Sequence, residues 1–279
     1  LILWKPREGE NLCRFEDLEK IMEDQGDEIA LLMIGSTNYY SGQLYPLKKI
    51  TELGHKHNSL VGFDLAHGVG NIQPNLHETG ADFAVWCTYK YLNGGHGAPA
   101  YLFVAEKHLK HAKNTLTGWM GHASPFGFDI NYEPSKTIEK FRCGTPAILS
   151  YLALEKSLDI FETIDFKELR EKSQNLSQLF IKLIEEKCAD FNLKLISPRN
   201  PEMRGSQVSL THPNSWEIMQ ALIDHNVIGD FRAPNIIRFG FTPLYTSYEN
   251  VWNAVKILQE IIETDIWKDP KYAVRKLVT

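Results

Sequence analysis

One lysine and one aspartate follow apolar runs of this chain, where a charged side chain is costly. Residues 81–87, "ADFAVWC", lead to Lys90, and residues 60–64, "LVGFD", end on Asp64. Neighbouring strands of an open α/β sheet would bring both side chains to the edge where such sheets bind ligands. A desolvated lysine is a Schiff-base nucleophile, and a nearby carboxylate keeps the ring nitrogen of pyridoxal phosphate protonated. The pair therefore points to a pyridoxal phosphate site.

Each of these residues also has a plainer interpretation. Lys90 could reach solvent from the surface, Asp64 could cap a helix, and His67 is ambiguous by itself. The glycine-rich residues 93–97, "NGGHG", are more typical of a turn between two strands than of a phosphate cradle. Arg238, inside the apolar run "NIIRFGF", could pair bidentately with a substrate carboxylate or form an internal salt bridge.

The elements that must position these residues are those of an α/β protein. Three apolar runs at residues 29–35, 60–66 and 81–87 predict strands buried on both faces, and residues 99–108 predict a further strand. Residues 44–58 have helical spacing between the first two strands. This βαβ pattern predicts a mostly parallel sheet with helices on both faces.

The pattern changes after Gly144. Thr145 and Pro146 predict the N-cap and first position of a long helix, Asp165 the cap of a second, and Ser215 the cap of a third. Strands at residues 193–197, 205–212 and 235–241 alternate with these helices and with a final one at residues 247–263. We therefore expect a large domain at residues 1–144, and a linking helix with a smaller α+β domain at residues 145–279.

Composition narrows the class of protein. The 279 residues are 43% hydrophobic and 23% charged with net charge −5, which favours neither a nucleic-acid nor an anionic-membrane partner. No apolar run reaches the roughly 20 residues that span a bilayer. The four cysteines lack disulfide or zinc spacing, which favours a reduced, cytoplasmic protein. The absence of GxGxxG after the first strands counts against dinucleotide binding.

Five motifs together resemble the kynureninase family of pyridoxal phosphate enzymes, which have the fold type I architecture of aspartate aminotransferase. They are "GFDLAHGVGN", "CTYKYLNGGHG", "LTGWMGH", "FRCGTPAI" and "IIRFGFTPLYTS". The resemblance runs along nearly the whole chain, and it is specific because the five motifs occur together. It also implies a segment before Leu1 that supplies a phosphate-binding threonine and an aromatic residue stacked on the cofactor ring.

The resemblance assigns roles residue by residue. It implies that Lys90 bonds to the cofactor, that Tyr89 contacts its phosphate and assists proton transfer, and that Asp64 pairs with its ring nitrogen. The other residues that it implies in the site are His67, Gly35 and Ser36 at the cofactor, Trp119 and Thr145 at the phosphate of the neighbouring subunit in a homodimer, and Arg238 and Gly144 at the substrate.

The activity implied is hydrolysis of L-kynurenine to anthranilate and L-alanine. Gly144 and Thr145 replace the Ser-Asn of animal enzymes that prefer 3-hydroxykynurenine, so the chain is similar to bacterial kynureninases. The alternatives are a cysteine desulfurase or aminotransferase of the same fold and a non-catalytic homologue. A desulfurase needs a cysteine on a mobile loop, whereas Cys87, Cys143 and Cys188 fall in a predicted strand, beside a helix cap and at a helix end.

Overall fold

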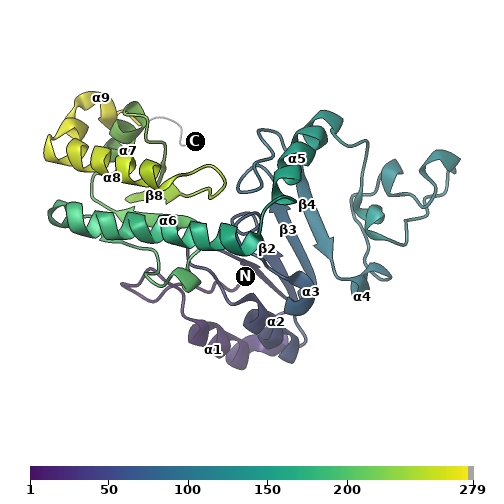
Figure 1. Ribbon diagram of the computed structural model, residues 1–279. Helices are drawn as coiled ribbons and strands as arrows, with labels where there is room; N and C mark the ends of the chain where they lie inside the picture. Colours follow the sequence, from purple (N-terminus) through teal and green to yellow (C-terminus); the bar gives the residue numbers. More distant parts are fainter. Residues whose placement is uncertain (276–279) are drawn as a thin grey trace. The chain divides into compact units, whose positions relative to one another are not determined.

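The computed structural model describes residues 1–275, and the chain divides into two compact units (Figure 1). Unit 1 comprises Leu1–Leu18, Thr37–Tyr45 and the chain from Ile164 onward; unit 2 comprises Glu19–Ser36 and Pro46–Thr163. The two units are described separately below.

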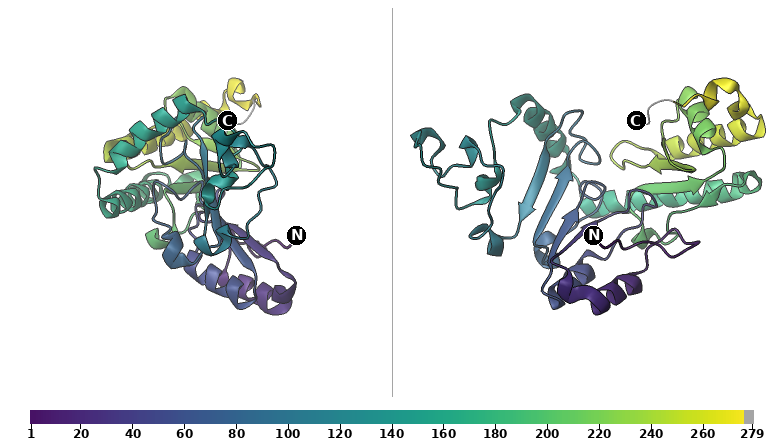
Figure 2. Two further views of the ribbon diagram at one scale, coloured as in Figure 1. Left: turned by 90° about the vertical axis from the view of Figure 1, so that its right-hand side faces the viewer. Right: turned by 180° about the vertical axis from the view of Figure 1, so that it is seen from behind.

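Unit 2 is built on a four-stranded sheet. Its strands are β1 (Leu31–Gly35), β2 (Leu60–Asp64), β3 (Phe83–Cys87) and β4 (Ala100–Val104), in that spatial order. The first three strands are parallel, and β4 runs antiparallel to β3 (Figure 2). Helix α2 (Leu47–Lys56) connects β1 to β2, so the predicted βαβ unit and the mostly parallel α/β sheet are confirmed.

One face of this sheet is well buried. Leu32, Val61, Phe63 and Ala84 point to that face and are at most 6% exposed. Helix α2 packs there, since a Cβ on its Gly54 would lie 2.4 Å from a methyl group of Val61. The alternating residues of β1 and β2 belong to the opposite face, where Leu31, Met33 and Leu60 are 45–47% exposed. Burial on both faces, which the apolar runs predict, therefore holds for the middle of β2 but is wrong for β1, an edge strand.

The other helices that lie wholly or partly in unit 2 are α1 (Phe15–Gln25), α3 (Leu76–Thr79), α4 (Glu106–Leu109) and α5 (Ile148–Phe161). Helix α5 belongs to unit 2 because its Ser157 hydroxyl donates to the Leu92 carbonyl at 2.5 Å and its Leu154 is buried. Conversely, two segments that precede residue 144 belong to unit 1. They are held together by the Gln43 side chain, which accepts a hydrogen bond from the Cys13 amide and donates one to the Cys13 carbonyl. The compact units therefore differ from the expected division at residue 144.

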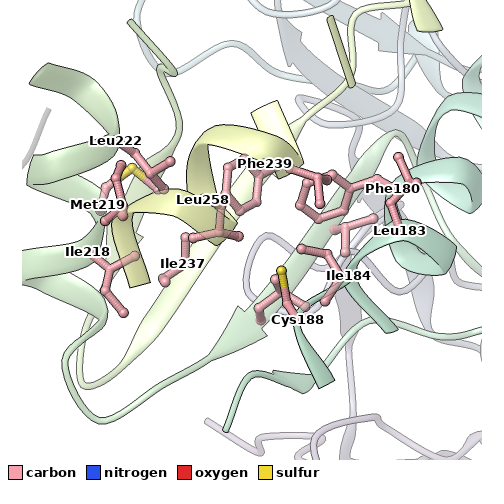
Figure 3. Packing of buried hydrophobic residues seen from close by; sticks show 14 of the residues in the cluster. Phe180, Leu183, Ile184, Cys188, Ile218, Met219, Leu222, Ile237, Phe239 and Leu258 are labelled. Atoms are coloured by element: carbon pink, nitrogen blue, oxygen red, sulfur yellow. The ribbon is translucent and has the colours of Figure 1, made fainter. Parts of the chain in front are cut away.

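Unit 1 contains an antiparallel sheet in the order β5-β6-β8-β7. The strands are β5 (Lys194–Leu195), β6 (Gln207–Thr211), β7 (Asp230–Arg232) and β8 (Ile236–Gly240). Helices α6 (Phe166–Lys187), α7 (Ser215–Asp224), α8 (Tyr248–Glu263) and α9 (Pro270–Ala273) complete it. The core joins Phe180 of α6, Met219 of α7, Leu258 of α8 and Phe239 of β8 (Figure 3). Each such buried side chain contributes roughly 1.5–3 kcal/mol of transfer free energy.

The predicted helix starts have different outcomes. The Asp165 side chain accepts a hydrogen bond from the Lys167 amide and caps α6, as predicted. The prediction for Ser215 is wrong by one residue, because Asn214 precedes α7 and Ser215 is its first residue. The prediction for Thr145 and Pro146 is also wrong: α5 begins at Ile148 after Ala147. Thr145 lies in the irregular segment before the helix, since the backbone there makes no helical turn.

Among residues 1–275, no helix combines the length and apolar character required to cross a bilayer.

Candidate functional site

Asp64 and Lys90 follow neighbouring strands at the same edge of the unit 2 sheet. Asp64 is the last residue of β2, and β2 pairs in parallel with β3, with Asp64 opposite Val85. The Asp64 carboxylate is exposed and accepts a hydrogen bond from the Ala66 amide at 2.8 Å. Lys90 lies three residues beyond the end of β3 and does not close the strand as predicted. The parallel pairing of the two strands is confirmed, whereas the approach of the two side chains stays a prediction.

The amine of Lys90 is held close to the strand it follows. Its Nζ donates to Cys87 Sγ at 3.4 Å and lies 4.9 Å from the centroid of the Tyr89 ring. Lys90 is partly buried, whereas the Tyr89 side chain is 53% exposed. The lysine is therefore not a freely extended surface residue, and the tyrosine is open to a ligand.

Gly35 and Ser36 lie beside Asp64 at the end of β1. Gly35 is the register partner of Asp64, and the Ser36 amide donates to the Asp64 carbonyl at 2.8 Å. Ser36 is fully buried, and its hydroxyl has no hydrogen-bond partner within residues 1–275. His67, in the turn after Asp64, is partly buried. The structure thus gathers these four residues at one edge of the sheet.

Residues 93–97 form a turn between β3 and β4, which confirms the plainer interpretation of the glycines. The chain reverses there with positive φ angles at Asn93, Gly95 and Gly97, and the Gly94 amide donates to the Thr88 carbonyl at 2.9 Å. A pocket of about 430 Å³ is lined by Tyr89, Asn93, Gly95, His96 and Gly97. The loop therefore borders a space that opens beside Tyr89.

Trp119, Gly144 and Thr145 lie in one irregular segment of unit 2. The Cys143 thiol donates to the Leu116 carbonyl at 2.9 Å, and a Cβ on Gly118 would lie 1.9 Å from the Cys143 carbonyl oxygen. These contacts bring the residue before Trp119 against the residue before Gly144. Trp119 is 46% exposed, and Gly144 and Thr145 are exposed as well.

Arg238 belongs to unit 1, in the middle of β8. Its Nε donates to both carboxylate oxygens of Asp230, at 2.8 and 3.0 Å, and its Nη2 also contacts Asp230. Nη1 donates to the Tyr39 carbonyl at 2.6 Å. Of the two interpretations left open by the sequence, the internal salt bridge is present. A contact with a substrate carboxylate stays a prediction.

Comparison with known proteins gives the family. The kynureninase C-terminal domain family matches residues 169–258. A kynureninase of Pseudomonas fluorescens is 41% identical over 273 residues, which cover 98% of this chain and 66% of that protein. A kynureninase of Burkholderia mallei is 44% identical over 253 residues, which cover 91% of this chain and 61% of that protein.

The chain belongs to the kynureninase family. It spans 61–66% of the length of these two family members.

Solved structures show that this kynureninase-family chain has the fold of pyridoxal phosphate enzymes of fold type I. A cysteine desulfurase from Thermococcus onnurineus superposes with a TM-score of 0.78 at 18% identity, over 92% of this chain and 65% of that one. An alanine–glyoxylate aminotransferase from Nostoc superposes with a TM-score of 0.66 at 19% identity, over 89% and 65%. At these identities the likeness shows the fold alone.

Sequence reasoning missed two partners of the predicted site residues in this kynureninase-family chain. Cys87 was considered only as a desulfurase candidate, although a spacing of three residues around a strand end allows it to contact Lys90. Asp230 was not considered, although two strands joined by a short turn at Pro234 place it opposite Arg238. Both contacts depend on strand ends that apolar periodicity alone does not locate.

Proposed function

We propose that this protein is a kynureninase that uses pyridoxal phosphate to hydrolyse L-kynurenine, with one water, to anthranilate and L-alanine. The observation that carries the proposal is the placement of Asp64 at the end of β2 and of Lys90 just beyond the adjacent parallel strand β3, with the Lys90 amine bonded to Cys87 at the end of that strand. Relatives named kynureninase, at 41–44% identity, support the choice of substrate.

The side chains at the sheet edge fit this cofactor chemically. It presents an aldehyde, a ring nitrogen and a phosphate, and the edge offers an amine, a carboxylate and a phenol in the same unit from Lys90, Asp64 and Tyr89. The orphaned, fully buried hydroxyl of Ser36 beside Asp64 is a further donor without a partner in residues 1–275. We assign Gly35, Ser36 and His67 to the same cofactor contact.

The protein residues then have separate tasks. When bound, pyridoxal phosphate supplies an electron sink for bonds broken next to the substrate's α-carbon. Asp64 holds the proton on the ring nitrogen through its carboxylate. Lys90 takes a proton from the substrate α-carbon through Nζ, and Tyr89 donates one to the carbon released from the γ-carbonyl.

Arg238 would hold the substrate α-carboxylate without giving up its internal partner. The Asp230 carboxylate accepts hydrogen bonds from the edge of the guanidinium that carries Nε and Nη2. A guanidinium has five N–H groups; Nε and Nη2 donate to Asp230 and Nη1 donates to the Tyr39 carbonyl, which leaves one further N–H on Nη1 and one on Nη2. These two donors can form a bidentate pair with a carboxylate. Gly144, which has open space where a side chain would lie, is assigned to the substrate.

We further propose a homodimer in the cytoplasm, with Trp119 and Thr145 contacting the cofactor phosphate of the neighbouring subunit. The segment that carries them has many exposed apolar side chains, as a subunit interface requires. Those at least 70% exposed are Leu116, Phe126, Phe128 and Ile130, and helix α5 adds Leu149. The four free cysteines support a reducing compartment.

The test is anthranilate fluorescence from purified protein given L-kynurenine, with 3-hydroxykynurenine as a second substrate. Lys90→Ala should lower turnover by about 10³-fold or more, because general acid–base catalysis alone contributes 10²–10⁴-fold. Lys48→Ala, which removes an exposed lysine of α2, is the matched control. Wild-type turnover in Lys90→Ala would contradict the assignment.

A cysteine desulfurase on the same fold would release alanine from L-cysteine and keep the sulfur as a persulfide on its own cysteine, from which an added thiol reductant would release sulfide. Cys143, the exposed thiol among the four free cysteines, does not lie beside a helix cap as expected. It lies in an irregular segment, and its thiol is held by the Leu116 carbonyl. Sulfide production without anthranilate would replace our proposal with this activity.

A further inference from the structure

The amine of Lys90 has two close neighbours in unit 2, a sulfur atom and an aromatic ring. Cys87 Sγ accepts its hydrogen bond at 3.4 Å, and the Tyr89 ring centroid is 4.9 Å from Nζ. A thiol sulfur is a weak acceptor, so it can orient an amine and still release it to a stronger reaction partner.

The strand register places that sulfur on the same face of the sheet as Asp64. Asp64 pairs with Val85, and Gly62 pairs with Phe83, in the parallel β2–β3 ladder. Side chains alternate along a strand, so Phe83, Val85 and Cys87 share the face of Gly62 and Asp64. Packing agrees, because a Cβ on Gly62 would lie 2.2 Å from the Phe83 ring.

Lys90 itself lies beyond the regular strand, where no ladder hydrogen bond determines the direction of its side chain. A lysine side chain has four rotatable bonds and can take many directions there. The contact with Cys87, the last strand residue, turns the amine back toward the face that carries Asp64. Cys87 is partly buried and its backbone pairs with Ala100 of β4, so the strand holds the Cα that carries the sulfur.

We propose that Cys87 is a positioning residue for Lys90: its sulfur holds the amine on the Asp64 face of the sheet, ready to capture the cofactor aldehyde. The inference rests on the proposed function, because it gives Lys90 the cofactor-binding role. Cys87 takes no part in bond making, and its effect on the reaction passes through the lysine.

The experiment compares three variants of the purified enzyme. Cys87→Ser keeps a hydrogen-bond acceptor, Cys87→Ala removes it, and Cys87→Val removes it while filling the volume and suiting a strand. Cofactor is removed, pyridoxal phosphate is added back, and the rise of the visible absorption band is followed by stopped flow. Borohydride reduction and peptide mass analysis then identify the lysine that carries the cofactor, and melting temperatures report on folding.

We expect Cys87→Ala and Cys87→Val to slow capture of the cofactor about 3- to 10-fold, the range that one hydrogen bond commonly controls. The value of kcat should fall similarly while KM for kynurenine stays within about 2-fold, and Cys87→Ser should remain near wild type. Cys188→Ala, which removes a buried thiol of unit 1, should not slow capture.

Two results would overturn the inference. If Cys87→Val captures cofactor as fast as wild type, the thiol only fills space. If all three variants slow capture in proportion to lost thermal stability, its role is structural. Failure of the proposed function is separate: the reduced cofactor would then be found on a lysine other than Lys90, or on none, in the wild-type protein.

Discussion

At the scale of single residues, the predicted site side chains differ in how they are held. Asp64 ends β2 and Lys90 follows the adjacent strand β3, whereas Arg238 is tied to Asp230 within unit 1. A buried ion pair costs desolvation free energy, which is repaid only when both partners are well hydrogen-bonded. Because Asp230 accepts several hydrogen bonds from Arg238, we infer that it holds the guanidinium in one orientation.

Substitution of Arg238 tests its proposed contact with the substrate carboxylate. Arg238→Lys keeps the charge but loses the planar fork, and we expect KM for L-kynurenine to rise roughly 10- to 100-fold, as loss of a charged hydrogen bond does. Steady-state kinetics by anthranilate fluorescence measure this. Arg232→Lys, which alters a second arginine near Asp230, is the control. An unchanged KM in Arg238→Lys would show that the arginine serves Asp230 alone.

At the scale of elements, a buried carboxylate ties several parts of unit 2 together. The Asp82 side chain is 2% exposed and accepts hydrogen bonds from His55 of α2 at 2.8 Å and from His108 of α4 at 2.6 Å. Lys107 and the Val61 amide also contact it, both at 2.7 Å. Burial acts to raise the pKa of Asp82, but these hydrogen bonds outweigh burial and hold that pKa well below its usual range.

Asp82→Asn should lower the free energy of unfolding by roughly 2–4 kcal/mol at pH 7, because it leaves buried donors poorly paired. A depressed pKa stabilises the fold above the ordinary value of 3.8, and this contribution is lost as the pH falls below it. The difference from wild type should thus shrink below about pH 4. Urea unfolding at several pH values measures it, and Asp27→Asn, at a fully solvent-exposed carboxylate, should have no comparable effect.

Two serines at helix starts give a second prediction at this scale. Ser247 caps α8 in a capping box with Asn250, so Ser247→Ala should cost about 1 kcal/mol of stability. Ser215 begins α7, but its buried hydroxyl has no partner within residues 1–275. Ser215→Ala should be neutral or slightly stabilising. Thermal unfolding of both variants measures the two changes in stability. Equal losses of stability would show that Ser215 also acts as a cap.

At the scale of the whole molecule, the proposed homodimer depends on the exposed apolar segment of unit 2. Phe128 and Ile130 are 83% and 97% exposed, which a monomer in water would not favour.

We expect Ile130→Asp to shift the protein from dimer to monomer and to weaken its affinity for pyridoxal phosphate, because we propose that Trp119 and Thr145 contact the cofactor of the neighbouring subunit. Light scattering and cofactor titration measure the two effects. Ile228→Asp, at an isoleucine of unit 1 that is 86% exposed, is the matched control. An Ile130→Asp protein that remains dimeric with wild-type cofactor affinity would place the interface elsewhere.

The sequence predicted most of the elements, because apolar runs and helical spacing reflect local burial. It located β2, β3 and the turn at residues 93–97, and it recognised the cap of α6 at Asp165. It failed at Thr145 and Ser215, where cap chemistry was present but the backbone began its helix elsewhere. It also missed β7, a three-residue strand too short for periodicity to show.

The sequence by itself determined the family and the residues of the candidate site, because five motifs with particular side chains carry that information. Tertiary structure decided what those residues contact. Pairing of β2 with β3 placed Asp64 and Cys87 on one face, the bend after Cys87 brought Lys90 to that sulfur, and the β7–β8 hairpin gave Arg238 its carboxylate. The physical reason is that strand register and chain reversal depend on contacts between segments distant in sequence, which no local pattern of residues specifies.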